Sequence, residues 1–405
     1  MERERGDGNL PRRKSRTSRI VASGLLLVIA AGAWYGVQEY RQAHSPVTLP
    51  ELASYTSASE KQLYRFLTAY MTDEQGGVCT NLMPTTAGAV TKHDLARGHA
   101  VLSESVGLLM EYAVRAQSRE LFEIEVRVLE KRFLTGDYFV RWLVPPLDGN
   151  DAQPSPSTVN SSIDDLRLVK GLLAGADQFH DEHARRLGEH IAKSLLTYNA
   201  ESGYLRDYAD VLTGTKAKQV SIRYLNVGVL AKLHDTDPAY AKVYQQSRAL
   251  LQKAQQPSGL YATAWVPEEG VFFQEEGEVA VDPSMAEQLV AALYAQEANL
   301  PTDAMTALLE KTLQTRHRLP AAVDRNGQAT SDVESPAVYA LAAVYLHRAS
   351  AEEAAQQCLT RLQEMQVKNG ERYAGGYVDL RTLEAFSFDQ LEALLALREA
   401  GDRTS

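Results

Sequence analysis

The residues that could do chemistry in this chain are carboxylates with apolar or small neighbours, and Glu104 is the first of them. Apolar side chains recur at helical spacing around it, and Ser103, Ser105 and Gly107 beside it are small. A carboxyl in such surroundings is costly to ionise, so we expect a raised pKa and a bound proton near neutral pH. A general acid needs that property. The alternative is a capping or ion-paired glutamate in the first turns of a helix.

Two further carboxylate positions stand at the starts of predicted helices. One is the segment NSSIDDLR, which holds Asp164 and Asp165, and the other is Asp282, followed by Pro283. Each pattern is also typical of a plain helix cap. Hydrolysis of a glycosidic bond requires two carboxyl groups on opposite sides of the sugar, one protonated and one ionised. Together with Glu104, these positions could therefore supply such a pair.

Aromatic side chains in predicted loops could stack on the apolar faces of sugar rings. Tyr138, Trp142, Trp265 and Phe272 all lie in or beside such loops, although each could equally be a packing residue. We favour Trp142 and Trp265, because they are two of only three tryptophans and stand between the carboxylate motifs.

The composition excludes several other kinds of site. The net charge of −10 and the scattered basic residues argue against nucleic-acid binding. The nine histidines show no metal-binding spacing, and no phosphate-binding glycine loop or nucleophile elbow occurs, so we expect neither a metal nor another cofactor. The spacing of Cys79 and Cys358 does not decide whether they pair.

The N-terminal part is unlike the rest of the chain. Residues 1–19 end in a basic cluster, and 20–38 form an uncharged run just long enough to cross a bilayer. The basic side predicts a cytoplasmic tail and a single-pass anchor, with the body outside the cell. A secretory signal cleaved near Ala31-Gly32-Ala33 is the alternative. Residues 39–58 read as a spacer before a domain at 59–405.

That domain is predicted to be all-α, with short β-hairpins in its loops, such as one formed by 259–266 and 270–279. Its periodicity predicts twelve helices, which suit an (α/α)6 toroid of six helical hairpins better than a simple bundle. The predicted ranges are 59–72, 93–116, 118–133, 161–179, 181–198, 219–234, 237–255, 283–298, 302–316, 333–348, 351–367 and 384–400.

At the carboxylate motifs the chain resembles glycoside hydrolase family 8, which includes endoglucanases, chitosanases and xylanases. The family's acid motif has the form Ser-Glu-Gly-x-Gly-x-x-Met, and Ser103, Glu104, Gly107 and Met110 match it, with Ser105 in place of the first glycine. The resemblance implies an (α/α)6 fold and an inverting mechanism without metal, with Glu104 as the general acid.

The later motifs of the family are matched in part. Its sugar-binding aspartate aligns with Ile163, so that role would pass to Asp164 or Asp165. Tyr224 matches a tyrosine that could orient water or substrate, and Asp282 aligns with the inverting base. The resemblance thus implies that Glu104 and Asp282 face each other about 6.5–9.5 Å apart, with room for a water molecule.

The variant motifs and the membrane-proximal start look most like a branch of the family associated with bacterial exopolysaccharide synthesis. This resemblance implies a membrane-tethered, endo-acting hydrolase of a β-1,4-linked or related exopolysaccharide, with an exopolysaccharide synthase complex as a possible partner. A polysaccharide lyase is disfavoured because Tyr224 has no histidine nearby in sequence. A catalytically inactive, polysaccharide-binding toroid in a secretion system is the other alternative.

Overall fold

The computed structural model describes residues 46–84, 98–147, 156–273 and 283–401. The chain divides into two units, Met1–Pro46 and Val47–Ser405, and the helices discussed below all belong to the second. The predicted tail and anchor at 1–38 lie outside the described residues. Within those residues, no helix has the length and apolar character needed to span a bilayer.

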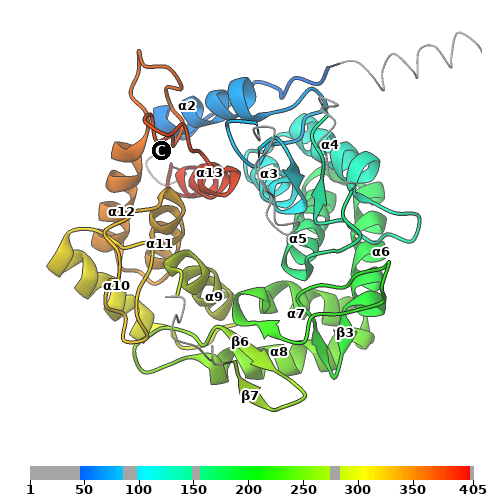
Figure 1. Cartoon of the computed structure of the whole chain (residues 1–405). Helices are drawn as coiled ribbons and strands as arrows, with labels where there is room; N and C mark the ends of the chain where they lie inside the picture. Colours follow the sequence, from blue (N-terminus) through cyan, green and yellow to red (C-terminus); the bar gives the residue numbers. More distant parts are fainter. Residues whose placement is uncertain (1–45, 85–97, 148–155, 274–282, 402–405) are drawn as a thin grey trace, which may run out of the picture. The chain divides into compact units, whose positions relative to one another are not determined.

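Twelve α-helices in the described part of Val47–Ser405 form two concentric layers (Figure 1). Six inner helices surround the centre: α3 (Ser103–Arg115), α5 (Ser162–Phe179), α7 (Val227–Thr236), α9 (Met285–Glu297), α11 (Pro336–Arg348) and α13 (Ser387–Gly401). Six outer helices alternate with them: α2 (Ala58–Phe66), α4 (Arg119–Val128), α6 (Glu182–Tyr198), α8 (Ala241–Ala254), α10 (Asp303–Arg316) and α12 (Glu352–Met365). This is the ring of helical hairpins predicted from the sequence.

The sequences of the two layers differ because their surroundings differ. Inner helix α11 is apolar on nearly every side, as a helix with neighbours all round must be. Outer helix α6 has one apolar stripe that includes Leu187, Ile191 and Leu195, and its other faces are polar. Side-chain caps fix the starts of several outer helices; Asp181, for example, accepts hydrogen bonds from two amides of the first turn of α6.

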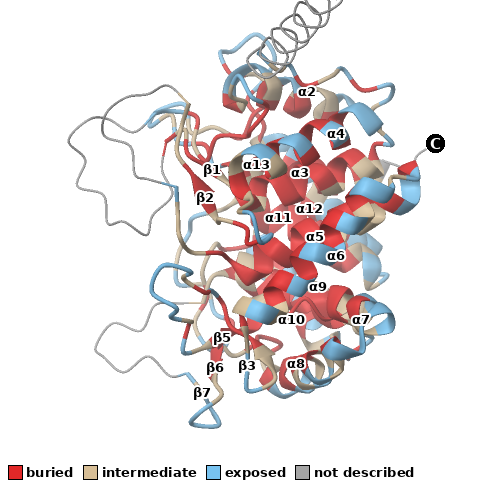
Figure 2. Cartoon of the chain, turned by 90° about the vertical axis from the view of Figure 1, so that its right-hand side faces the viewer, coloured by how far each residue is buried: buried red, intermediate tan, exposed pale blue. Residues whose placement is uncertain are grey.

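Short strands gather at one end of the helices (Figure 2). The predicted hairpin is present as β6 (Ala264–Val266) and β7 (Val271–Phe272), and β5 (Val220–Ser221) pairs with the other edge of β6. Two further antiparallel pairs join β1 (Val101–Leu102) to β2 (Leu143–Val144) and β3 (Ala200–Glu201) to β4 (Tyr204–Leu205). Part of the second predicted arm, 274–279, lies outside the described residues.

Two helices were predicted to begin too early. The range 93–116 included β1, and the range 219–234 included β5 and the 3₁₀ turn Ile222–Tyr224. In both places apolar residues continue the helical periodicity of the sequence. Their backbones instead pair with a strand from elsewhere in the chain, so tertiary pairing overrides the local sequence pattern. The ordered domain also begins before 59, because Leu49 and Leu52 of the predicted spacer are buried in the core.

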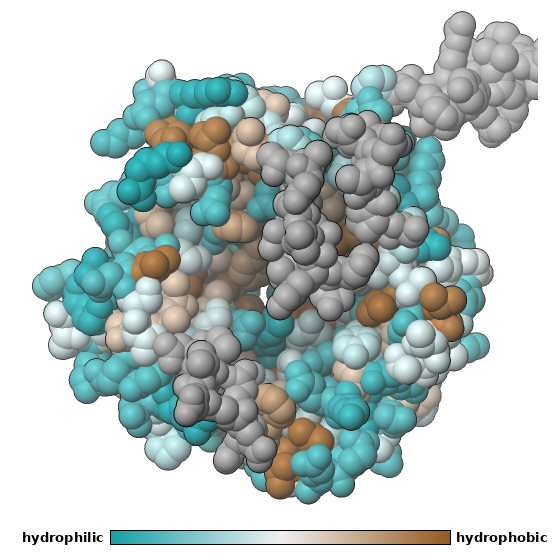
Figure 3. Space-filling model, viewed as in Figure 1, coloured by the Kyte–Doolittle hydropathy of each residue, from teal (hydrophilic) through white to brown (hydrophobic). Residues whose placement is uncertain are grey.

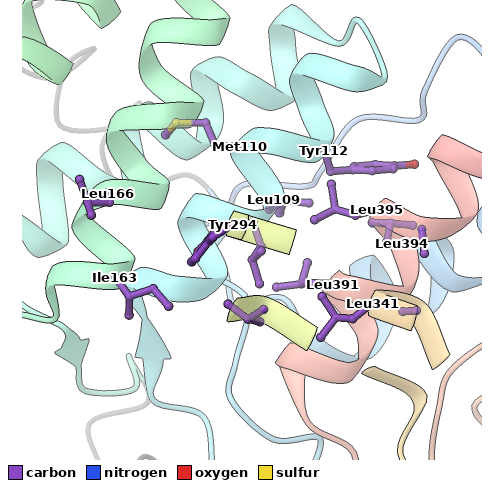
Figure 4. Packing of buried hydrophobic residues seen from close by; sticks show 14 of the residues in the cluster. Leu109, Met110, Tyr112, Ile163, Leu166, Tyr294, Leu341, Leu391, Leu394 and Leu395 are labelled. Atoms are coloured by element: carbon purple, nitrogen blue, oxygen red, sulfur yellow. The ribbon is translucent and has the colours of Figure 1, made fainter. Parts of the chain in front are cut away.

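Glycines let α5 pack closely against its neighbours. A Cβ on Gly171 would lie 3.0 Å from the Met110 side chain of α3, and one on Gly175 would lie 2.1 Å from the Phe122 ring of α4. Around these contacts, apolar side chains from α3, α5, α9, α11 and α13 fill the centre of the domain (Figure 4).

The ring is closed by a buried ion pair between the first and last helices. Arg398 Nε of α13 lies 2.8 Å from Glu60 Oε1 of α2, without the angle of a good hydrogen bond, and Glu60 is fully buried. Tyr112 of α3 donates its hydroxyl to the same oxygen at 2.7 Å, and Thr56 donates to the other oxygen. Three helices far apart in sequence therefore meet at one carboxylate.

A closed ring of six alternating charges lies towards the C-terminal ends of the inner helices. It joins α3, α5, α9, α11 and α13 through six ion pairs with lengths from 2.7 to 3.7 Å. Its members, in order, are Glu111, Lys170, Glu297, Arg348, Glu399 and Arg115. Burial favours the neutral acid at Glu111, but Lys170 and Arg115 outweigh it and lower its pKa to about 2.

The Gly175 contact predicts a clear stability effect. We expect Gly175→Ala to destabilise the fold, because Phe122 is fully buried beside Phe179 and has no space to move. Overpacking costs about 1–3 kcal/mol, of which the better helix propensity of alanine recovers up to about 1 kcal/mol. Urea unfolding measures the difference. Gly136→Ala is the control, since nothing lies within 4 Å of its added Cβ; equal midpoints for both variants would contradict the close packing.

The ring closure predicts that Arg398→Met is strongly destabilising. It leaves the Glu60 carboxylate buried without its cation, which costs about 3–5 kcal/mol. The matched control is Arg65→Met, which breaks the Arg65–Glu51 pair of nearly the same length, 2.9 Å, where both side chains are more than half exposed. That change should stay within about 0.5 kcal/mol. Similar thermal midpoints for the two variants would show that the buried pair does not hold the ring closed.

Candidate active site

The first carboxylate of the candidate site, Glu104, lies in the first turn of α3. The strand pair β1–β2 leads directly into this helix, and the Ser103 amide donates to the Trp142 carbonyl at 3.0 Å, which fixes where the helix begins. The Glu104 side chain is 21% exposed, and α3 begins at the end of the ring where the short strands lie (Figure 2). Figure 3 shows a hollow at the middle of the ring face.

Asp164 occupies the equivalent first turn of α5 and is almost completely buried. Ser103 Oγ donates to Asp164 Oδ2 at 3.4 Å, which links the starts of α3 and α5. Burial, reinforced by the nearby charge of Glu104, raises the pKa of Asp164 to about 7, although Arg167 acts in the opposite direction. Asp164 is therefore a carboxyl that can hold a proton near neutral pH.

Arg167 joins these two carboxyls. Its Nη1 donates to Glu104 Oε2 at 2.8 Å and to Asp164 Oδ1 at 3.4 Å. The sequence predicted a largely apolar environment for Glu104 and left an ion-paired glutamate as the alternative; the structure has the ion pair. Our sequence reasoning missed Arg167, although its position one helical turn after Asp164 was a signal that could have found it.

Asp165 and Ile163 point elsewhere. Asp165 Oδ2 accepts a hydrogen bond of 2.7 Å from Asn160, and Asn160 also bonds to Asn199. Asp165 therefore belongs to a buried network of polar side chains at the start of α5. Burial raises its pKa well above the usual range. Ile163 is part of the core (Figure 4). Of the two aspartates proposed to replace the family's sugar-binding residue, the structure therefore brings only Asp164 to Glu104.

Tyr224 ends the 3₁₀ turn between β5 and α7 and stands close to Asp164. Burial raises its pKa to about 12, with the charges of Asp164 and Asp207 adding to the effect. Asp207 was not predicted; it accepts hydrogen bonds of 2.7 and 2.6 Å from the amide and hydroxyl of Ser221 and so fixes the strand before Tyr224. Arg223 packs over the Tyr224 ring, 5.0 Å from its centre.

The aromatic residues predicted to stack on sugar rings differ in how accessible they are. Trp142 is half-buried, and its backbone bonds to both Ser103 and Val159, which places it beside the starts of α3 and α5. Trp265 is only 9% exposed, because Phe272 and Lys253 cover it. Tyr138 stacks on His190 of α6. Trp142 is thus the better placed of the two favoured tryptophans.

An aromatic residue that the sequence analysis missed also lies near the carboxylates. Phe386, 47% exposed, precedes α13 and pairs through its backbone with Asn81. The next residue, Ser387, bonds through its hydroxyl to Ser105 of α3 at 3.1 Å. Nothing local in the sequence marks Phe386, since Ser387 beside it contacts α3 only because the last helix returns to the first hairpins.

The predicted base, Asp282, lies outside the described residues, so the separation of Glu104 and Asp282 stays a prediction. In the described ranges, no group of three or more His, Cys, Asp or Glu side chains is arranged to hold a metal ion.

No model of a known protein family matches the chain. Among curated sequences, YdaJ of Bacillus subtilis is 24% identical over 311 residues, which cover 76% of this chain and 82% of YdaJ. Among solved structures, one described as a novel alpha-amylase from Clostridium perfringens is similar with a TM-score of 0.76 and 25% identity, covering 86% of this chain and 99% of that one.

Two other solved structures extend the comparison. PssZ from Listeria monocytogenes has a TM-score of 0.64 and 22% identity, over 86% of this chain and 97% of PssZ. Endoglucanase Cel10 from Klebsiella pneumoniae, a family 8 glycosyl hydrolase, has a TM-score of 0.57 and 15% identity, over 84% of this chain and 99% of Cel10. The resemblance to glycoside hydrolase family 8 is confirmed, and the chain has a glycoside hydrolase fold.

Proposed function

We propose that this protein hydrolyses glycosidic bonds within a polysaccharide, with Glu104 as the general acid and Asp282 as the general base of an inverting reaction. One observation carries the proposal: Glu104 and Asp164 meet through Arg167 at the end of a glycoside hydrolase ring where the strands and loops lie. Glu104 would protonate the leaving oxygen. Asp282 would take a proton from a water molecule on the other face of the sugar.

Geometry argues against Asp164 as the base. Its Oδ1 and Glu104 Oε2 both contact one nitrogen, at 3.4 and 2.8 Å, so these oxygens are closer than the separation an inverting pair needs to admit water, about 6.5–9.5 Å. A base must also be ionised, whereas burial raises the pKa of Asp164 to about 7. A hydrogen bond to a hydroxyl of the sugar being cleaved suits Asp164 better, with Tyr224 and Trp142 completing the contacts.

The substrate we favour is a β-1,4-linked or related bacterial exopolysaccharide, cut outside the membrane by a domain tethered through residues 20–38. Support comes from the fold shared with endoglucanases and from the sequence motifs. The similar structure described as an alpha-amylase makes an α-linked glucan the main rival. A synthase complex for the same polymer would be the natural partner.

A second function is favoured by one contact. Arg167 engages Glu104 at 2.8 Å, and a glutamate that served only as the anion of this pair would not donate protons. The ring would then bind a polysaccharide without cutting it. Activity measurements separate the two functions directly.

We expect the full-length chain to release reducing ends from one polymer in a panel of β-glucan, xylan, chitosan, starch and the exopolymer of its own cell. Glu104→Gln and Asp282→Asn should each lower that activity about 10²–10⁴-fold, because each removes one proton transfer. Glu182→Gln, a change on the exposed first turn of α6, is the control and should leave it intact. NMR of the first product should show the inverted anomer.

Three outcomes would count against parts of this assignment. Activity that survives in Asp282→Asn moves the base to another residue. Retention of the anomeric configuration rejects the inverting mechanism. Binding of a polymer without release of reducing ends favours the inactive toroid.

The raised pKa of Asp164 predicts a pH dependence of stability. Its folded pKa of about 7 lies above the ordinary value of 3.8, so the folded state binds the proton more tightly. Stability is therefore lost as pH rises from about 4 to 7. Asp164→Asn removes this loss, so the variant should gain stability relative to wild type over that range in urea unfolding.

The control for this prediction is Asp137→Asn. Hydrogen bonds from Thr135 and Tyr198 lower the pKa of Asp137 below its ordinary value of 3.8, so this change should have the opposite sign: the variant loses stability relative to wild type as pH rises towards about 5, and the difference stays constant above that pH. A constant difference between wild type and Asp164→Asn from pH 4 to 8 would reject the assignment.

A further inference from the structure

Arg167 is held rigidly between the two helices that carry the candidate carboxylates. The residue is 8% exposed. Gly107 of α3 lies directly against its stem, since a Cβ on that glycine would be 3.1 Å from Arg167 Cβ. The backbone of α3 therefore limits where the side chain can go, and the guanidinium has little freedom to leave Glu104.

The contact distinguishes the two oxygens of Glu104. Arg167 Nη1 donates to Oε2 at 2.8 Å, while Oε1 has no hydrogen bond to any described residue. A carboxyl held by one oxygen presents the other in a fixed direction. An ammonium would be a point charge without this planar geometry, so lysine is no equivalent here.

The charged and titratable groups that act on Arg167 come from four inner helices. They are Glu104 and Glu111 on α3, Asp164 on α5, Tyr294 on α9 and Glu392 on α13. Burial raises the pKa of Glu392 to about 7, as it does for Asp164. Near neutral pH these two carboxyls are therefore partly protonated, and Glu104 has the shortest contact with the guanidinium.

We propose that Arg167 is the positioning residue of the reaction: it holds Glu104 by Oε2, directs Oε1 to the leaving oxygen, and neutralises the carboxylate that remains. This inference rests on the proposed function. In the step itself, the O–H bond of Glu104 breaks, its electron pair stays on Glu104, and the proton bonds to the glycosidic oxygen. The bond from the anomeric carbon to that oxygen breaks with its electrons going to the oxygen, and water forms the new bond to the carbon and gives its proton to the base. The negative charge so formed on Glu104 lies beside a fixed cation.

The test compares Arg167→Ala with wild type in the full-length chain, on the polymer that the panel identifies. We expect kcat to fall about 100-fold, as misplacement of a catalytic group does, while KM changes less than about threefold because the substrate contacts remain. Guanidinium ion at about 50 mM should raise the kcat of Arg167→Ala about tenfold or more, since it replaces the missing charge-assisted hydrogen bonds. Arg167 also lines a partly open chamber of about 70 Å³, which offers space beside the vacated site.

Arg348→Ala is the matched control. Arg348 lines the same chamber and pairs with Glu297 and Glu399, but not with Glu104. Its loss should lower stability without a response of kcat to guanidinium. If Arg167→Ala keeps the wild-type kcat, or loses it without rescue while remaining folded, the positioning role is rejected. If Arg167→Ala does not fold, Arg167→Lys decides: a kcat about tenfold lower supports the role, and a wild-type kcat rejects it.

A titration separates this inference from the proposed function. In carbon-13 NMR of the carboxyl groups, Asp164 should titrate with a midpoint of about 7 in wild type. Arg167→Ala should shift the Asp164 midpoint upward, because Arg167 lowers the pKa of Asp164. An unchanged midpoint overturns the inference even where activity exists. A wild type inactive on every polymer rejects the proposed function, while the titration still shows whether Arg167 controls the Asp164 carboxyl.

Discussion

The structure depends on the closure of a ring whose two ends are not covalently joined. Nothing in a succession of helical hairpins requires the last hairpin to meet the first. Here α13 packs against both α2 and α3, and Arg398, Glu60 and Tyr112 form a buried polar junction at that point. Charged and polar side chains are costly to bury unless all three partners are present. This junction therefore disfavours an open or shifted ring of helices more strongly than apolar packing alone would. Closure also brings Ser387 and Glu392 of α13 to the site.

Close packing of α3 and α5 is the second constraint, and it creates the site. Gly107 and Gly171 allow the two helices to approach until Glu104 and Asp164, each in a first turn, share one arginine. The carboxyls are then near enough to influence each other, and the balance of burial, repulsion and one cation leaves Asp164 able to gain or lose a proton near neutral pH. A larger residue at Gly107 would alter that balance without touching a carboxyl.

Helical periodicity and the glycine, proline and capping signals were sufficient to predict twelve helices and their arrangement in hairpins. They failed at β1 and β5, because pairing with β2 and β6 depends on residues about forty positions away. For the site, Glu104 and Asp164 were predicted, and the structure brings them together. Arg167 was missed because a charged residue inside a helix usually faces solvent. Phe386 and Glu392 were beyond local reasoning, because they reach the site only through ring closure.

The common direction of the inner helices accounts for the different charged residues at the two ends of the ring. The starts of α3, α5, α9 and α13 carry acidic residues, Glu104, Asp164, Glu287 and Asp389, and the ends of α3 and α11 carry Arg115 and Arg348. Helix dipoles favour both placements, by about 0.3–1 kcal/mol for each charge. At the acidic end, the dipole and Arg167 favour an ionised Asp164, whereas burial and the charge of Glu104 favour a neutral one more strongly, so the pKa of Asp164 rises to about 7. At the other end, Glu297 and Glu399 oppose the dipole, and their ion pairs with Arg348, Lys170 and Arg115 compensate. A carboxyl whose charged and neutral forms are close in free energy near neutral pH, that of Asp164, thus lies at the end where the helices begin.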